Sequence, residues 1–106
     1  SGHVSTEIVY DFEWDAAKAR GNLRKHRVSF RAATAVFRDP LALTTYDDEH
    51  SEHEERWVTL GRAQNGPYLV VVHTVAQVSE VEVHIRIISA READRQEIQD
   101  YERAPR

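Results

Sequence analysis

The sequence predicts an α+β fold in which two N-terminal helices precede an antiparallel sheet of about four strands and a C-terminal helix closes the chain. Apolar residues between positions 16 and 37 recur at spacings of three and four, which is typical of helices. From Arg56 onward they alternate at every second residue, which is typical of strands. The final polar segment, residues 90–103, follows a helix-capping pattern.

The first helix is predicted to begin at Ala16, because Asp15 has a side chain suited to the N-cap position. A short extended segment around Phe12 and Trp14 precedes it. The predicted apolar stripe consists of Ala16, Ala19 and Leu23. Gly21 weakens the interior of such a helix by about 1 kcal/mol relative to alanine. We therefore expect packing of Leu23 and the aromatic residues to hold the helix in place.

A second helix and a strand are predicted next. Ser29 can cap a helix whose apolar residues are spaced by three and four, and the pair Asp39-Pro40 ends it. The segment LALTTYD, residues 41–47, has the composition of a β-strand. A strongly acidic segment, residues 47–55, follows and is expected to form a loop.

The rest of the chain is predicted to consist mainly of strands. Residues 56–62 and 68–76 flank an Asn-Gly turn signal, so they should form an antiparallel hairpin. In the next strand, one set of side chains would face the core, namely Val81, Val83, Ile85 and Ile87. The opposite set would be Glu82, His84, Arg86 and Ile88. Ser89 and Glu92 match a capping box that would open the C-terminal helix.

The size of the chain bounds its organisation. With 106 residues, 41% of them apolar, we expect one domain with one core, spanning residues 1–106. Residues 1–7 are expected to be a tag remnant or a disordered tail. No apolar run of about 18 residues could span a bilayer and no signal-peptide pattern is present, so we expect a cytoplasmic location without membrane contact. The absence of cysteine excludes disulfides and thiolate chemistry.

Charge is distributed unevenly along the chain. The formal net charge of −4 by itself argues against a nucleic-acid partner. Six carboxylates lie within residues 47–55, however, so the rest of the chain has a net charge of +2 and contains all 14 basic residues. Most of these are arginine, whose planar guanidinium suits bidentate contacts with phosphate. A phosphate-binding face is therefore compatible with the acidic total.

The acidic segment contains two histidines in an H-x-x-H spacing. His50 and His53 could bind a metal ion together with neighbouring carboxylates. Several acids on one polar segment are better accommodated in water, and a metal site also needs convergent ligands. We therefore expect residues 47–54 to be a solvated loop and expect no metal site.

Glu55 and Arg56 form a separate candidate beside this loop. Trp57 begins the strand pattern and should anchor in the core, which would hold its two neighbours at the edge of the sheet. Glu55 and Arg56 could form an ordinary ion pair. They could also supply an acid/base group beside a phosphate-binding guanidinium.

Three histidines outside the loop could move protons near neutral pH. His26 lies at the end of the basic helix, where a histidine interacts favourably with the helix dipole. His73 interrupts an apolar strand, a position typical of a hydrogen-bonded core residue. His84 lies on the polar side of its strand. Spacing alone does not select one of them.

Arg86 and Arg91 form the strongest basic pair in the sequence. Arg86 projects from the polar side of its predicted strand. Arg91 follows the predicted Ser89 cap, where the N-terminus of a helix favours anions. Both could be ordinary solvated side chains, but two arginines at this place would also suit a phosphodiester.

Four segments of the sequence are specific in combination: FEWDAAKARGNLRKHRVSFRAATAVFRDPLA, HSEHEERWVTLGR, LVVVHT and IRIISAREA. Together they resemble the BrnT family, the toxin half of a bacterial type II toxin–antitoxin pair, from Phe12 to about Tyr101. The resemblance implies a RelE-like fold, a ribonuclease that arrests translation, and neutralisation by a BrnA antitoxin with a ribbon-helix-helix DNA-binding part. Operator DNA would be bound only through that antitoxin.

The resemblance also implies a reaction that uses no cofactor and no metal ion. The 2′-hydroxyl of the RNA attacks the adjacent phosphorus and leaves a 2′,3′-cyclic phosphate and a 5′-hydroxyl. Such a reaction needs a proton acceptor, a proton donor and cations around the phosphate. We expect Arg56, Arg86 and Arg91 to stabilise the phosphate. Glu55 is the expected base, and Tyr101 is the expected donor.

Contact with the RNA substrate is expected from Arg24, Lys25 and His73, and His26 is expected to contact substrate or transfer a proton. The acidic loop could bind basic residues of the antitoxin or repel RNA from one side. A second function stays open, namely a catalytically silent module that docks its partner through the same basic face and acts in operon repression.

Overall fold

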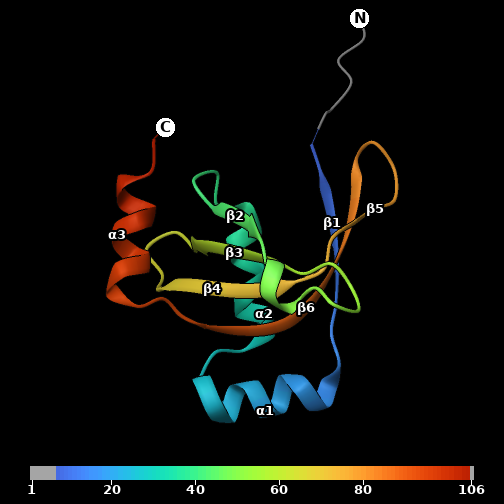
Figure 1. The fold of residues 1–106 in the computed structure, drawn as a ribbon, viewed down its shortest axis with the longest axis horizontal. Coiled ribbons are helices and arrows are strands. Elements are labelled where there is room, and N and C mark those ends of the chain that lie inside the picture. The colour runs from blue at the N-terminus through green and yellow to red at the C-terminus, as the bar shows by residue number, and fades with distance from the viewer. Residues whose placement is uncertain (1–6, 106) are drawn as a thin grey trace, which may run out of the picture.

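The structure, a computed structural model, describes residues 7–105 and places helices on both faces of one sheet (Figure 1). The elements follow in the order β1 (Val9–Glu13), α1 (Ala16–His26), α2 (Phe30–Ala33), η1 (Thr34–Arg38), β2 (Leu43–Tyr46), η2 (Asp48–His50), β3 (Trp57–Arg62), β4 (Tyr68–His73), β5 (Ala76–Gln77), β6 (Glu82–Glu92) and α3 (Arg95–Arg103). No helix in the described range has the length and apolar character needed to cross a membrane. Residues 1–6, most of the expected N-terminal tail, lie outside the described residues.

The sheet confirms the α+β class but differs from the predicted sheet in size and direction. Within the described range it has six strands in the order β1-β6-β4-β3-β2, with β5 also paired to β6. All neighbours are antiparallel except β1, which runs parallel to β6. The prediction of about four antiparallel strands left out β1 and β5. Both pair with the first part of β6, because this strand of 11 residues is longer than its six-residue neighbour β4.

Helix capping in the first half of the chain follows the sequence. The Asp15 carboxylate accepts a hydrogen bond from the backbone N–H of Lys18 at 3.0 Å, and α1 begins at Ala16 as predicted. The Ser29 hydroxyl accepts one from the backbone N–H of Ala32 at 3.0 Å. The second predicted helix is present as the short α2 followed by the 3₁₀ helix η1.

The C-terminal helix begins later than predicted. Ser89 and Glu92 belong to β6, where they pair with Val72 and Leu69 of β4, so the expected capping box at these residues is wrong. Their backbone groups are used in the sheet ladder and are not available to start a helix. The capping box is instead formed by Asp94 and Glu97, and α3 begins at Arg95.

A bulge in β6 decides which side chains share a face of the sheet. Ile85 and Ile87 are each 1% exposed and face α1 and α2, as the alternation predicted. The pairing with β4 then shifts by one residue, and Ala90 becomes the next fully buried residue on that face. Arg86 and Arg91 therefore point to the same, opposite face, although they are five residues apart.

Two apolar cores lie on the two faces of the sheet. The larger one joins α1, α2 and η1 to the sheet and is built around Phe30, Val36, Val71, Ile85 and Ile87. The smaller one, between α3 and the other face, contains Leu60, Val70 and Tyr101. Because α3 lies at the end of the sheet away from β1 and β5 (Figure 1), it covers only part of its face. The remainder of that face, called the open sheet face below, includes Arg56 and Arg86.

The attachment of α1 to the sheet differs from the prediction. Leu23, expected to pack against the core, is 49% exposed, whereas Asn22 is only 8% exposed. The Asn22 side-chain amide donates hydrogen bonds to the carbonyl oxygens of Val28 and Ala90, each at 2.9 Å. Its Oδ1 accepts one from the backbone N–H of Ala90 at 3.1 Å. Asn22 thus hydrogen-bonds both the N–H and the carbonyl of Ala90, which lies in the part of β6 beyond its pairing with β1.

Candidate functional site

Arg56 and Arg86 meet at one carboxylate on the open sheet face. Arg86 extends from β6, and its Nη2 donates a short hydrogen bond to Oε2 of Glu54. Arg56 lies just before β3, and its Nη2 is 3.7 Å from Oε1 of the same carboxylate. The backbone N–H of Arg86 donates a hydrogen bond of 3.3 Å to the Thr74 hydroxyl. Two guanidinium groups from separate segments of the chain therefore converge on a single anion.

The electrostatics around Glu54 favour a negative charge at this point. The hydrogen bond from Arg86 is the main cause that lowers the pKa of Glu54, and the charges of Arg86, Arg56 and Lys18 act in the same direction. The Nε of Arg56 is shielded from solvent and has no hydrogen-bond partner among the described residues. These groups are about one-third exposed, so an anion from solution can reach them. We call Arg56, Arg86 and Glu54 the arginine pair site.

A histidine lies beside the arginine pair site on the same face. His84 is two residues before Arg86 on β6, and side chains at this spacing share a face about 7 Å apart. Its Nδ1 is 3.1 Å from Oδ2 of Asp11, and its Nε2 is 3.0 Å from Oε1 of Glu13. The hydrogen bond to Glu13 is the main cause that raises the pKa of His84, and the hydrogen bond to Asp11 adds to it.

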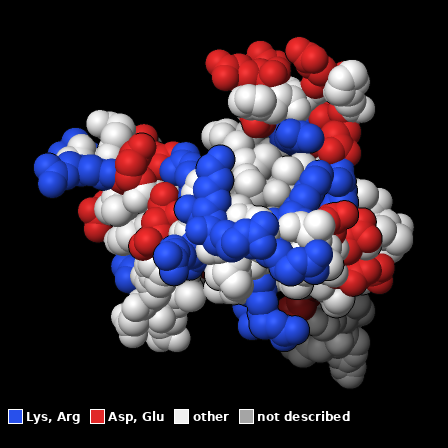
Figure 2. All heavy atoms as spheres, turned by 90° about the horizontal axis from the view of Figure 1, so that it is seen from below, with Lys and Arg blue, Asp and Glu red and all other residues white. Residues whose placement is uncertain are grey.

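The helix α1 carries a continuous basic surface. Figure 2 shows Lys and Arg side chains gathered over the middle of the face that α1 presents, with acidic side chains at its margins. The exposed basic residues of this segment are Lys18, Arg20, Arg24, Lys25 and Arg27. No acidic residue occurs within α1, and no ion pair involves these five side chains in the part of the chain that the structure describes. Arg24, Lys25 and His26 occupy its last turn, as the sequence predicted.

Arg91 does not join the arginine pair site. It shares the face of Arg86 but lies roughly 15 Å further along β6. Its two terminal nitrogens each donate a hydrogen bond of 2.8 Å to the carboxylate of Glu97 in α3. This pairing raises the pKa of Arg91 and lowers the pKa of Glu97. Because β6 continues to Glu92, Arg91 lies on a strand and not at a helix N-terminus, which corrects the position expected for it.

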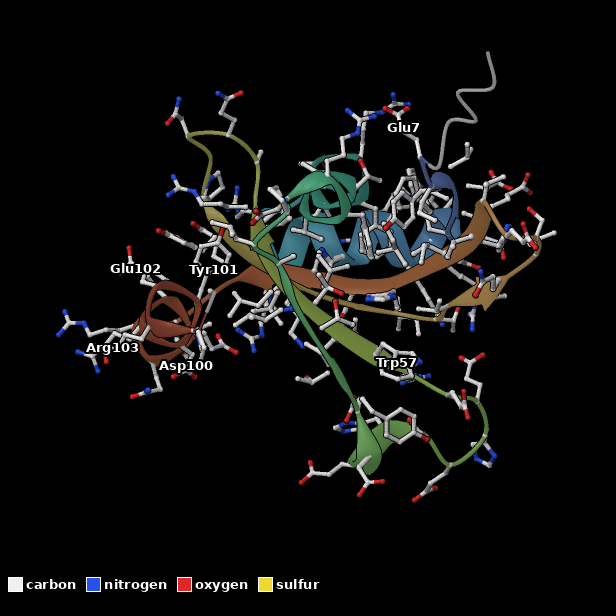
Figure 3. All side chains as sticks on the ribbon, turned by 90° about the horizontal axis from the view of Figure 1, so that it is seen from above. Glu7, Trp57, Asp100, Tyr101, Glu102 and Arg103 are labelled. Atoms are coloured by element: carbon white, nitrogen blue, oxygen red, sulfur yellow. The ribbon has the colours of Figure 1, made fainter. Side chains whose placement is uncertain are left out.

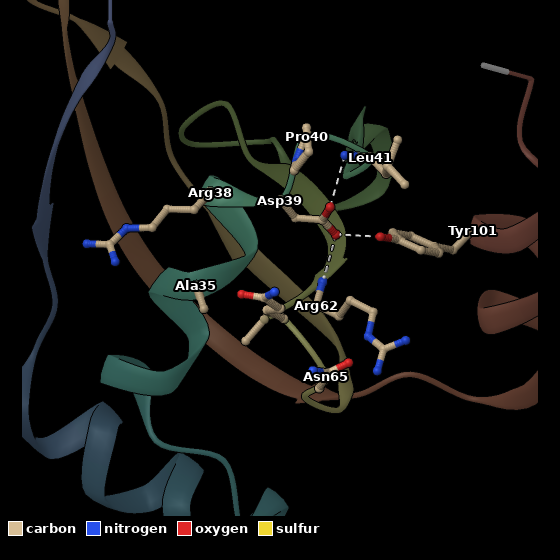
Figure 4. A pocket seen from close by; sticks show the side chains of 10 residues that line it. Ala35, Arg38, Asp39, Pro40, Leu41, Arg62, Asn65 and Tyr101 are labelled. Carbon is tan, nitrogen blue, oxygen red and sulfur yellow. Dashed lines mark hydrogen bonds between the residues drawn. The ribbon is translucent and has the colours of Figure 1, made fainter.

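Tyr101, the expected proton donor, lies at the opposite end of the sheet. Figure 3 shows it on the side of α3 that faces the sheet, whereas Arg103 points away from it. Its hydroxyl donates a hydrogen bond of 2.6 Å to Oδ2 of Asp39, and the backbone N–H groups of Leu41 and Arg62 also bind this carboxylate (Figure 4). A hollow of about 720 Å³ adjoins them. Tyr101 is therefore placed away from Arg56 and Arg86.

His73 is a core residue, since it is 1% exposed. Its Nδ1 lies 3.1 Å from the carbonyl oxygen of Thr74, and its Nε2 lies 2.7 Å from the hydroxyl of Thr59. A carbonyl only accepts, so Nδ1 carries a proton, and burial favours the neutral form of the ring. This burial agrees with the core position and leaves His73 no surface for the RNA contact expected of it.

The buried ring makes stability depend on pH. Burial lowers the pKa of His73 below the ordinary value of 6.5, so the unfolded chain binds a proton more readily than the folded one. Its contribution to the free energy of unfolding is expected to be complete above about pH 6.5 and to decrease as the pH falls toward the folded pKa. An NMR titration should give a midpoint for the His73 ring below 6.5. A midpoint at or above 6.5 would contradict the buried neutral state.

The acidic loop contributes one member of the site. A hollow of about 250 Å³ beside it is lined by Glu49, His50, Glu52, His53, Glu54 and Arg56. Within residues 7–105, no three of the potential ligands His, Asp and Glu lie close enough to hold a metal ion. Glu55, the expected base, is exposed and has no side-chain hydrogen bond or ion pair in the described range. Its neighbour Glu54, expected to be only a solvated residue, occupies the position between the arginines.

Sequence reasoning did not select Glu54 or His84 as members of the site. Strand alternation already placed His84 on the same face as Arg86, so it could have predicted that both residues belong to one site. The carboxylates beside His84 come from β1, which the sequence predicted only as an extended segment. Glu54 depends on the loop conformation, for which the sequence has no pattern.

The fold and the site define the class of this protein: a small α+β protein whose open sheet face presents two arginines that converge on one carboxylate. A family model described as "Ribonuclease toxin, BrnT, of type II toxin-antitoxin system" matches residues 14–97. The chain belongs to this family, and the resemblance seen in its sequence is confirmed.

Comparison with solved structures supports the fold. The chain is similar to the 1.1 Å crystal structure of the Brucella abortus ribonuclease toxin, BrnT, with a TM-score of 0.53 and 21% sequence identity. The match covers 86% of this chain and 100% of that chain. No curated protein sequence matches the chain.

Proposed function

We propose that this protein is a metal-independent endoribonuclease toxin whose reaction takes place at the arginine pair site. The observation that carries the proposal is the convergence of Arg56 and Arg86 on the carboxylate of Glu54. A carboxylate and a phosphodiester each present two anionic oxygens, which guanidinium groups bind through paired hydrogen bonds. Glu54 therefore occupies, in the resting protein, the position that the phosphodiester takes when RNA binds.

The chemistry follows from this exchange. The phosphodiester replaces Glu54 between the guanidinium groups, which stabilise the negative charge that develops on the phosphorane. The 2′-oxygen bonds to phosphorus while the bond from phosphorus to the 5′-oxygen breaks. The released Glu54 carboxylate accepts the 2′-hydroxyl proton, a role for which it is better placed than Glu55. Tyr101 and Arg91 are not part of this centre because of their distant positions and their bonds to Asp39 and Glu97.

The basic surface of α1 supplies the sequence-independent part of RNA binding. Exposed side chains without carboxylate partners, such as Arg24 and Lys25, neutralise backbone phosphates and release counterions. His26 lies on the same turn and adds a contact to substrate. α1 packs against β6 on the face opposite to Arg86, so an RNA strand that contacts both this surface and the arginine pair site has to pass around the edge of the sheet.

The family implies an antitoxin partner, and we propose a BrnA-type antitoxin with a ribbon-helix-helix DNA-binding part. Operator DNA is then bound only through that partner, and the pair acts in the cytoplasm. The acidic loop is suited to basic residues of the antitoxin, because complementary charge speeds association.

The proposal is tested by incubating the purified chain with a short RNA in the presence of EDTA. Cleavage is expected to persist, changing by less than about twofold, and to leave a 2′,3′-cyclic phosphate and a 5′-hydroxyl. An oligonucleotide with 2′-deoxyribose at the cleavage position is the matched control and should remain intact. Loss of cleavage in the chelator would indicate a metal-dependent nuclease. No cleavage by the folded protein would favour the catalytically silent module.

A further inference from the structure

We infer that His84 is a catalytic residue that donates the proton to the departing 5′-oxygen of the RNA, held in position by Asp11 and Glu13. This inference rests on the proposed ribonuclease function and adds the proton donor that it lacks. Tyr101, the donor expected from the sequence, is not available at the arginine pair site, and no other described histidine lies on its strand β6.

The hydrogen bonds of His84 select the doubly protonated ring. Each ring nitrogen faces a carboxylate oxygen, at 3.1 Å for Asp11 and 3.0 Å for Glu13. A carboxylate only accepts hydrogen bonds, so both nitrogens carry a proton when both contacts are made. The two carboxylates therefore favour the imidazolium, which is the form that a general acid needs, and they raise the pKa of His84.

The position of His84 fits this role. Its side chain is 31% exposed, and it shares a face with Arg86 at a spacing of two residues. Glu13 is the direct neighbour of Arg86 across the parallel pair of β1 and β6, so the carboxylate that holds His84 lies next to the phosphate position. A nucleotide whose phosphate binds Arg86 places its 5′-oxygen within reach of the ring.

The protons balance in the step as we propose it. When the 2′-oxygen bonds to phosphorus, Nε2 of His84 gives up its contact with Glu13 and passes its proton to the departing 5′-oxygen, while Asp11 holds Nδ1 and Glu54 holds the proton from the 2′-hydroxyl. His84 is then neutral and Glu54 is protonated. Exchange of one proton with water at each group restores the resting forms.

The charged surroundings of His84 set the expected pH dependence. Asp11 and Glu13 on β1 favour the charged ring, and its partial desolvation opposes this. Glu82 and Arg86 share its face of β6, and the neighbouring β5 offers only Ala76 and Gln77. Because the pKa of His84 is raised above 6.5, activity should remain high through that pH and fall as the pH rises further. Replacing Glu13 by Gln removes the largest cause of the raised pKa of His84. The decrease in activity with rising pH should then occur at lower pH.

The decisive test compares two substrates that differ only in their need for a proton donor. Cleavage of RNA expels an alkoxide-like 5′-oxygen that must be protonated, whereas uridine 3′-(4-nitrophenyl phosphate) expels a nitrophenolate that does not. His84→Gln keeps a hydrogen-bonding side chain and is expected to slow RNA cleavage by about 100-fold. The same variant should slow cleavage of the nitrophenyl ester by less than about threefold, because that step needs no general acid.

Arg86→Ala is the matched comparison, since both substrates need the phosphate to be held and both rates should fall. Equal losses on the two substrates for His84→Gln, or no loss on RNA, would overturn the role of His84 while leaving the ribonuclease function intact. If the wild-type protein cleaves neither substrate, the proposed function fails and this inference fails with it.

Discussion

Replacing Arg86 by alanine is expected to lower kcat/KM for RNA cleavage by about 1000-fold, the largest effect of any single substitution in the proposed site. Arg86 is the residue that binds the Glu54 carboxylate most closely, and its backbone N–H is fixed by the Thr74 hydroxyl. Its guanidinium is thus preorganised at the position where charge develops in the transition state. The loss should appear mainly in kcat, because α1 still binds the RNA backbone.

Arg91→Ala is the matched control for this prediction. It removes the same type of side chain from the same strand and the same face, but Arg91 is held by Glu97 and lies roughly 15 Å further along β6. We expect kcat/KM to fall by less than about tenfold. Rates are measured with one RNA at fixed salt, and thermal unfolding checks that both variants are folded. Equal losses in the two variants, or full activity in Arg86→Ala, would contradict the proposed site.

These contrasting expectations for two arginines also show what the sequence could predict. The alternation in residues 81–88 correctly placed Arg86 opposite the buried Ile85 and Ile87. It could not place Arg91, because the bulge shifts the register and the pairing with β4 continues β6 past a plausible capping box. Capping residues are compatible with the start of a helix but do not force a helix to start there. Here the pairing of Ser89 and Glu92 with β4 kept these residues in a strand, and such long-range pairing has no local sequence pattern.

The candidate site was predicted only in part for a related physical reason. Arg56 and Arg86 could be selected because each lies on or beside a strongly patterned strand. Their shared partner Glu54 comes from a segment of six carboxylates that all look alike in sequence, and only the loop conformation distinguishes Glu54 from Glu55. Likewise, the role of Asn22 in attaching α1 was not predicted, because a helix usually packs against a sheet through its apolar stripe.

Replacing Asn22 by alanine is expected to lower the free energy of unfolding by about 3 kcal/mol. The substitution removes three hydrogen bonds in a buried position and leaves the N–H and the carbonyl of Ala90 without these partners. A buried backbone group that loses its partner costs about 1–3 kcal/mol. Few apolar contacts replace them, because within residues 7–105 Ala19 is the one apolar side chain of α1 that packs against the larger core.

Leu23→Ala provides the control for this prediction from the same turn of the helix. Leu23 is the largest apolar side chain of α1 but is 49% exposed, so its removal should change the free energy of unfolding by less than about 0.5 kcal/mol. Urea denaturation of both variants measures the difference, and a loss of 3 kcal/mol corresponds to a decrease in Tm on the order of 15 °C. If Leu23→Ala proves the more damaging change, α1 is held by its apolar stripe after all. If Asn22 is the anchor, RNA binding by α1 should weaken in Asn22→Ala as the helix detaches from β6.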